Sequence, residues 1–140
     1  MKLKYRNITR FKYEVVEDWS IQTDIKGCAC HTDHITLDDG GLLTAKAGYK
    51  WDGASGPTID TPDSQCGSCA HDMLYELMRR SLLEQSWRPY SDRLLHDVCV
   101  ENGMNPIRAD IWKSMVETFA AGAAKFGTQP KDEVFEVGKE

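Results

Sequence analysis

Residues 66–78 read Cys-Gly-Ser-Cys-Ala-His-Asp-Met-Leu-Tyr-Glu-Leu-Met. Apolar side chains recur in this stretch at the three- and four-residue spacing of one helix face. They are Cys66, Cys69, Ala70, Met73, Leu74, Leu77 and Met78. Just before them come Asp63 and Ser64, two residue types that cap helix N-termini. The stretch therefore predicts an amphipathic helix that begins near Asp63 or Ser64 and runs to about Ser81.

Two further helices are predicted downstream. The first begins near Ser91 and ends at Gly103, and it buries Leu95, Val98 and Cys99. The second begins at Pro106, because proline is favoured in the first turn of a helix, and it continues to Gly127.

The chain before residue 60 is expected to contain strands and little helix. Residues 11–16 and 19–23 are rich in β-branched and aromatic side chains and predict a first hairpin. Residues 34–37 and 42–45 flank the turn-forming sequence Asp-Asp-Gly-Gly and predict a second. Residues 48–62 are rich in glycine and proline and are expected to form a structured loop. The predicted fold is α+β, with small N-terminal antiparallel hairpins followed by three helices in one domain, residues 1–127, and a polar tail, residues 128–140.

Composition limits the classes of partner. The chain has 140 residues, 17 Lys+Arg against 22 Asp+Glu, and a net charge of −5, which argues against broad electrostatic binding to nucleic acid. No signal peptide and no transmembrane segment are predicted, because no apolar run has the necessary length. The odd number of cysteines, five, indicates a reducing compartment.

Four of the cysteines fall in two close pairs. Cys28 with Cys30, and Cys66 with Cys69, could supply four thiolates to a structural zinc ion. A redox-labile pair, or free buried thiols, would explain the same spacing, and these alternatives stay open.

One group of residues points to acid–base chemistry. His71 and Tyr75 are four residues apart and share a helix face, whereas Asp72 lies about 100° around the helix from His71. Asp92 and His96 are likewise four apart on the next helix. If the two helices pack through their apolar stripes, residues at the edges of the stripes meet, and a histidine beside a carboxylate is a general base of fixed tautomer. The alternative is a structural hydrogen bond between the helices.

Residues 48–127 resemble a family of small bacteriophage and prophage proteins of unknown function. The resemblance is carried by Trp-Asp-Gly-Ala-Ser-x-Pro at residues 51–57, by His71-Asp72-x-x-Tyr75, and by Arg88-x-x-Ser-Asp92. It implies a setting in the host cytoplasm or in the phage virion, with phage particle subunits as partners.

The sequence His71-Asp72-Met-Leu-Tyr75, followed by Ser91-Asp92-Arg93, also resembles the catalytic core of phospholipase A2, above all the parvovirus capsid type. The resemblance implies that His71 deprotonates the attacking water, that Asp92 holds the imidazole, and that Tyr75 donates to Asp92. It further implies a phospholipid or other lipid ester as substrate.

A calcium ion is implied by the same resemblance. Asp72 would bind it together with backbone carbonyls of the loop from Tyr49 to Gly53, including that of Trp51, and Asp52 could add a second carboxylate.

Two other interpretations remain. Ser55 could act as a nucleophile in a triad with His71 and Asp92. Alternatively, the chain is a non-enzymatic virion or host-interaction protein in which the His71–Asp92 network is structural. A third alternative is a binding module that is stabilised by zinc.

Overall fold

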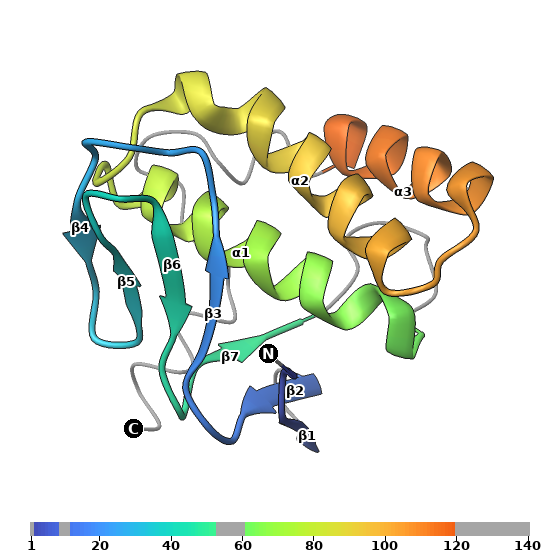
Figure 1. The fold of residues 1–140 in the computed structure, drawn as a ribbon, viewed down its shortest axis with the longest axis horizontal. Coiled ribbons are helices and arrows are strands. Elements are labelled where there is room, and N and C mark those ends of the chain that lie inside the picture. Colours follow the sequence, from blue (N-terminus) through green and yellow to red (C-terminus); the bar gives the residue numbers. More distant parts are fainter. Residues whose placement is uncertain (1, 9–11, 53–60, 120–140) are drawn as a thin grey trace.

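The computed structural model describes residues 2–8, 12–52 and 61–119 (Figure 1). The strands are β1 (Tyr5–Ile8), β2 (Lys12–Val15), β3 (Trp19–Gln22), β4 (Cys30–His31), β5 (Ile35–Leu37), β6 (Leu42–Ala45) and β7 (Lys50–Trp51). The helices are α1 (Gln65–Arg79), α2 (Arg88–Glu101) and α3 (Pro106–Phe119), and 3₁₀ turns at Pro62–Ser64 and Gln85–Trp87 precede α1 and α2. N-terminal antiparallel strands followed by three helices confirm the α+β class.

The strands form two antiparallel sheets, with the orders β1-β2-β7 and β3-β6-β5-β4. The predicted hairpin of residues 34–45 is present, with Ile35 opposite Ala45. Its turn is held by Asp38, whose Oδ1 accepts the backbone N–H groups of Gly40 and Leu42 at 3.0 and 2.8 Å. The turn-forming residues 38–41 therefore set the register of β5 and β6.

The predicted hairpin between residues 11–16 and 19–23 is wrong. β2 pairs with β1 and β7, whereas β3 pairs with β6 in the other sheet. The linking residues Glu17 and Asp18 lack the glycine or asparagine that a tight hairpin turn needs. Instead, the Asp18 carboxylate accepts the backbone N–H of Ala47 at 2.8 Å as the chain passes between the sheets.

The helix boundaries differ from the predicted ones by a few residues. The 3₁₀ turn before α1 begins after Thr61, whose backbone N–H donates to Ser64 Oγ at 3.1 Å. α2 begins at Arg88, earlier than the predicted Ser91, and Gly103 follows its end with φ +100°. α3 begins at Pro106 as predicted, and the expected continuation to Gly127 lies outside the described residues, as does the predicted tail.

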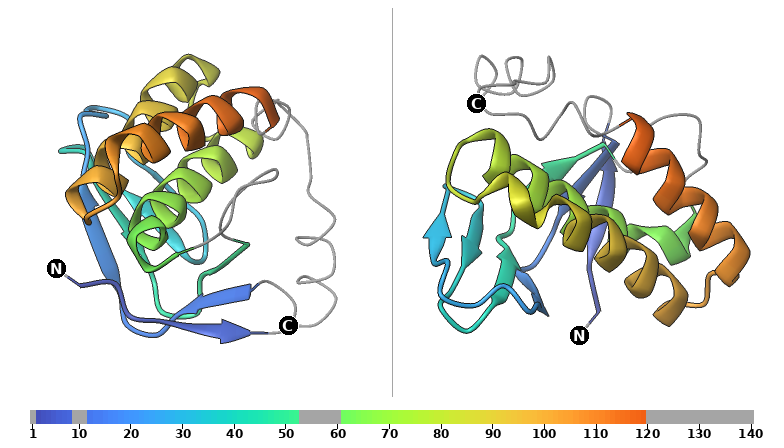
Figure 2. Two further views of the ribbon diagram at one scale, coloured as in Figure 1. Left: turned by 90° about the vertical axis from the view of Figure 1, so that its right-hand side faces the viewer. Right: turned by 90° about the horizontal axis from the view of Figure 1, so that it is seen from above.

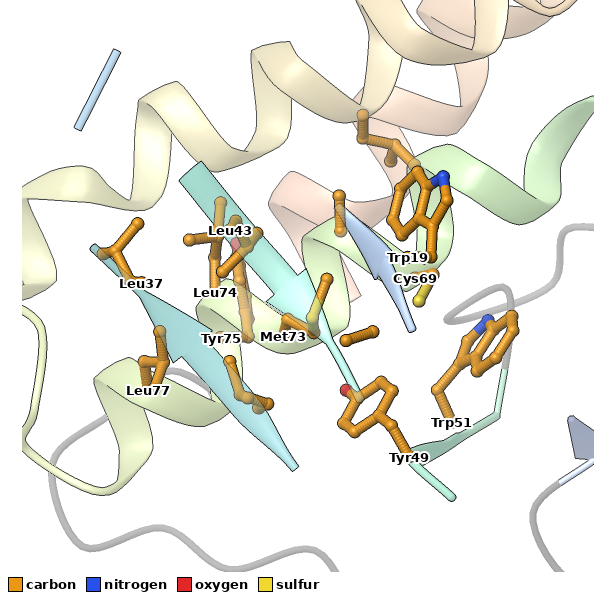
Figure 3. Close-up of a cluster of buried hydrophobic side chains, with 14 of the residues drawn as sticks. Trp19, Leu37, Leu43, Tyr49, Trp51, Cys69, Met73, Leu74, Tyr75 and Leu77 are labelled. Atoms are coloured by element: carbon orange, nitrogen blue, oxygen red, sulfur yellow. The ribbon is translucent and has the colours of Figure 1, made fainter. Parts of the chain in front are cut away.

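Helix α1 occupies the centre of the molecule. It packs against the four-stranded sheet and against α2, and α3 packs on α2 (Figures 1 and 2). The stripe that predicted this helix is buried against inward-facing side chains of the sheet, as Figure 3 shows. These side chains include Trp19, Leu37 and Leu43, opposite Cys69, Met73, Leu74 and Leu77. Within the described residues, no helix has the length and apolar character needed to cross a membrane.

Candidate active site

The predicted meeting of His71 and Asp92 is present. His71 on α1 and Asp92 on α2 face each other across the helix interface, with His71 Nε2 2.7 Å from Asp92 Oδ1. The two side chains are only 3% and 4% exposed. The connection between the helices makes this pairing feasible, because the chain leaves α1 through Ser81 and returns through the 3₁₀ turn at Gln85–Trp87. Asp92 therefore lies in the second turn of α2, opposite the middle of α1.

Tyr75 completes the network. Its hydroxyl donates to the same Asp92 oxygen at 2.6 Å, and its ring lies against the His71 ring with centroids 4.1 Å apart. Burial and the hydrogen bond to Asp92 both raise the pKa of Tyr75, so the phenol stays protonated and acts as a donor. One carboxylate oxygen thus receives a proton donor from each of the two rings.

The electrostatic surroundings favour a histidine that can accept a proton. Burial disfavours the imidazolium form of His71, but the carboxylates of Asp72 and Asp92 outweigh burial and raise its pKa above the ordinary 6.5. With Nε2 facing Asp92, the second nitrogen, Nδ1, lies 3.8 Å from Asp72 Oδ1. The Asp72 side chain is 25% exposed. Of the two nitrogens, Nδ1 therefore faces the more exposed of the two carboxylates.

Strand β7 contacts α1 on the face that carries Asp72. Trp51 Nε1 donates to Ser68 Oγ at 3.1 Å, one helical turn before Asp72. Burial, together with the negative charges of Glu76 and Asp72, raises the pKa of Tyr49 well above its ordinary value. The loop that the resemblance assigned to calcium thus begins beside Asp72.

The ligands predicted for calcium lie only partly within the described residues. The Tyr49 carbonyl accepts the backbone N–H of Val15 at 2.8 Å and belongs to the sheet. Gly53 lies outside the described residues, and among those described no three or more His, Cys, Asp or Glu side chains form a group that could hold a metal ion. Asp72 and Asp52 do not combine into such a group.

The predicted zinc ligands are in different parts of the fold. Cys28 and Cys30 lie at β4, on the edge of the four-stranded sheet, whereas Cys66 and Cys69 lie in the first turns of α1. All five cysteines are free thiols, and burial raises the pKa of Cys30, Cys66 and Cys69. In the absence of a metal ion these three thiols are therefore favoured in their protonated form. The arrangement matches the alternative of free, partly buried thiols.

Among the described residues, one other predicted participant, His96, does not join the network. His96 is four residues from Asp92, but its nitrogens contact Asp97 and Asp110 at 2.9 and 2.8 Å near the surface between α2 and α3. Ser55, the alternative nucleophile, lies outside the described residues.

Two residues that contribute to the site were not predicted from the sequence. Ser68 accepts a hydrogen bond from Trp51, and Gly67 lies in close contact with Leu95 and Cys99 of α2. A glycine inside a predicted helix was the available signal for the second of these.

Comparison of the chain with protein-family models, with curated proteins and with solved structures finds no match.

Proposed function

We propose that the protein is a small hydrolase of the phospholipase A2 type, which cleaves a lipid ester with water activated by His71. The observation that carries the proposal is the buried arrangement in which Asp92 Oδ1 lies 2.7 Å from His71 Nε2 and 2.6 Å from the Tyr75 hydroxyl. The residue types and their order match those expected from the resemblance to phospholipase A2.

The chemistry follows from the orientation of the imidazole. A hydrogen bond from Nε2–H to Asp92 leaves the lone pair on Nδ1, which can take a proton from a water molecule. The resulting hydroxide attacks the ester carbonyl, and the imidazolium is stabilised by Asp92 and Asp72. When the tetrahedral intermediate collapses, the proton passes from Nδ1 to the departing alkoxide, which leaves as an alcohol beside the carboxylic acid.

Tyr75 and Asp92 act through the histidine. Asp92 fixes the tautomer of His71 and its ring orientation, and the Tyr75 hydroxyl holds the Asp92 carboxylate in place. Neither needs to touch the ester. The net charge of −5 disfavours docking on anionic lipid, so the proposed substrate is a zwitterionic phospholipid. The proposed setting is a bacteriophage or prophage, in the host cytoplasm or in the virion.

The deciding experiment measures fatty-acid release from phosphatidylcholine vesicles, with calcium and with EDTA. The wild type should release fatty acid above the background of His71→Ala. The variant His96→Ala is the matched control, because its histidine lies near the surface, and it should retain the wild-type rate. Release that is equal in the wild type and in His71→Ala contradicts the proposed hydrolase. A rate that is unchanged by EDTA rules out the calcium requirement while leaving the hydrolase intact.

A second function is favoured by the burial of the histidine, whose side chain is 3% exposed. In this alternative, the network joins α1 to α2 in a non-enzymatic virion or host-interaction protein. His71→Ala should then reduce stability by about 1–3 kcal/mol, as expected when a buried hydrogen-bond partner is lost, and there is no activity to lose. Recovery of the wild-type chain as an ordered subunit of a phage particle, inactive on vesicles, would support this alternative.

A further inference from the structure

Gly67 lies at a close contact between α1 and α2. A Cβ atom built on this residue would be 2.7 Å from Cys99 Sγ and 3.0 Å from the Leu95 carbonyl oxygen. Ordinary contacts between such atoms are about 3.5–4.0 Å. Glycine is disfavoured inside a helix, and here it lets the backbone of α1 approach that of α2 where any side chain would intervene.

This contact is adjacent to the candidate active site along the same interface. Gly67 precedes His71 by four residues and so shares its face of α1. Leu95 and Cys99 follow Asp92 by three and seven residues, which is the spacing of one face of α2. One helical turn, about 6 Å, therefore separates the contact at Gly67 from the contact between His71 and Asp92.

We propose that Gly67 is a positioning residue for the His71–Asp92 pair, because its missing side chain sets the separation of α1 and α2 at which this hydrogen bond forms. An added methyl group would push the helices apart by up to about 1 Å unless Cys99 yields. A bond that is 2.7 Å long would then exceed the usual limit of about 3.2 Å.

The inference rests on the proposed function only for its kinetic consequence. A catalytic group displaced by 1 Å can lose activity by about 100-fold. If the protein is a hydrolase, Gly67→Ala should reduce kcat by about 10- to 100-fold, with KM nearly unchanged. The geometric claim has its own readout, which is the pKa of His71 measured by NMR titration of its ring protons.

Three variants separate positioning from general destabilisation. Gly67→Ala should lower the pKa of His71, because the imidazolium loses the nearby Asp92 carboxylate. Cys99→Ala, the matched control, should leave that pKa at the wild-type value. In the double variant the closest contact is removed, and the Leu95 carbonyl oxygen at 3.0 Å and Leu95 Cδ1 at 3.2 Å remain. The pKa of His71 should therefore return most of the way to that of Cys99→Ala.

These titrations test the positioning role of Gly67 whether or not the protein hydrolyses phospholipid. A Gly67→Ala variant that is less stable but keeps the wild-type pKa of His71 overturns the positioning role. If Gly67→Ala does not fold, the double variant is compared with Cys99→Ala. The contact of 3.0 Å that remains should still lower the pKa of His71 measurably, and equal values in these two variants overturn the inference.

Discussion

The hydroxyl of Tyr75 and the imidazole of His71 meet at a single oxygen, Oδ1 of Asp92, at 2.6 and 2.7 Å. A buried carboxylate oxygen that accepts from two ring donors is fixed in position, because rotation of the carboxylate would break both bonds. The rigidity of the site therefore depends on Asp92 more than on either ring.

Replacement of Asp92 by asparagine should be the most harmful conservative change in the network. The amide keeps the shape but removes the negative charge that faces two donors in a buried place. We expect a loss of about 2–3 kcal/mol in the free energy of unfolding, measured by urea denaturation, and a lower pKa of His71. Asp97→Asn is the matched control, because the Asp97 side chain is 65% exposed beside His96, and it should change stability by less than about 1 kcal/mol.

Tyr75→Phe isolates the second bond to Asp92. The aromatic ring against His71 is retained and only the hydroxyl is lost, so the free energy of unfolding should fall by about 1 kcal/mol. Tyr90→Phe serves as the comparison, because the Tyr90 hydroxyl accepts the exposed backbone N–H of Asp24 at 3.0 Å. Equal losses in the two variants, measured by denaturant titration, would show that burial adds nothing to the bond made by Tyr75.

The two roles proposed for His71 predict opposite responses to pH. Its pKa in the folded protein is raised above 6.5, so its contribution to stability is fully present below pH 6.5 and is lost as the pH rises through the folded-state pKa. Hydrolysis needs the neutral imidazole, so the rate should rise over the same interval. Denaturant midpoints and initial rates measured between pH 5 and about 9 check both trends. The variant His71→Gln should lack the part of the pH dependence of stability that arises from titration of His71. If the denaturation midpoints of the wild type and the variant change in parallel with pH across this range, the assignment to His71 is wrong.

The end of α1 contains a strained residue that offers a test away from the site. Ser81 has φ +64°, and the N–H groups of Leu82 and Ser81 bond to the carbonyls of Leu77 and Met78 at 2.9 and 3.1 Å. This is a helix-ending motif in which glycine is preferred. Ser81→Gly should therefore raise the free energy of unfolding by about 1 kcal/mol.

The opposite substitution is available at the end of α2. Gly103 has φ +100°, and a Cβ added there meets nothing within 4 Å, so Gly103→Ala tests backbone strain without a clash. It should lower the melting temperature while Ser81→Gly raises it. Shifts in the same direction would mean that φ at these two positions does not control stability.

Local patterns were sufficient for much of the fold. The apolar stripe of residues 66–78 predicted α1, and the Asp-Asp-Gly-Gly turn predicted the pairing of β5 with β6. The pairings of β2 with β7 and of β3 with β6 were not predictable in this way, because the partners are distant in sequence. Strand pairing between distant segments depends on contacts that a local pattern does not contain.

The candidate site was also predictable in part, because helical spacing is a local pattern. Helical spacing placed His71 and Tyr75 on one face, and packing of two apolar stripes brought Asp92 to them. Spacing alone could not distinguish Asp92 from His96 as the residue that meets α1. That choice depends on where α2 begins, which is at Arg88, directly after the 3₁₀ turn of Gln85–Trp87.

All three members of the network lie between residues 71 and 92, within one helical hairpin. A short chain segment loses little entropy when its ends are brought together, so contacts within this hairpin can form rapidly. None of the three residues comes from a strand. A substitution in a strand therefore acts on the His71 imidazole through the packing of α1 on the sheet, whereas a substitution within the hairpin can remove one of the hydrogen bonds of the network itself.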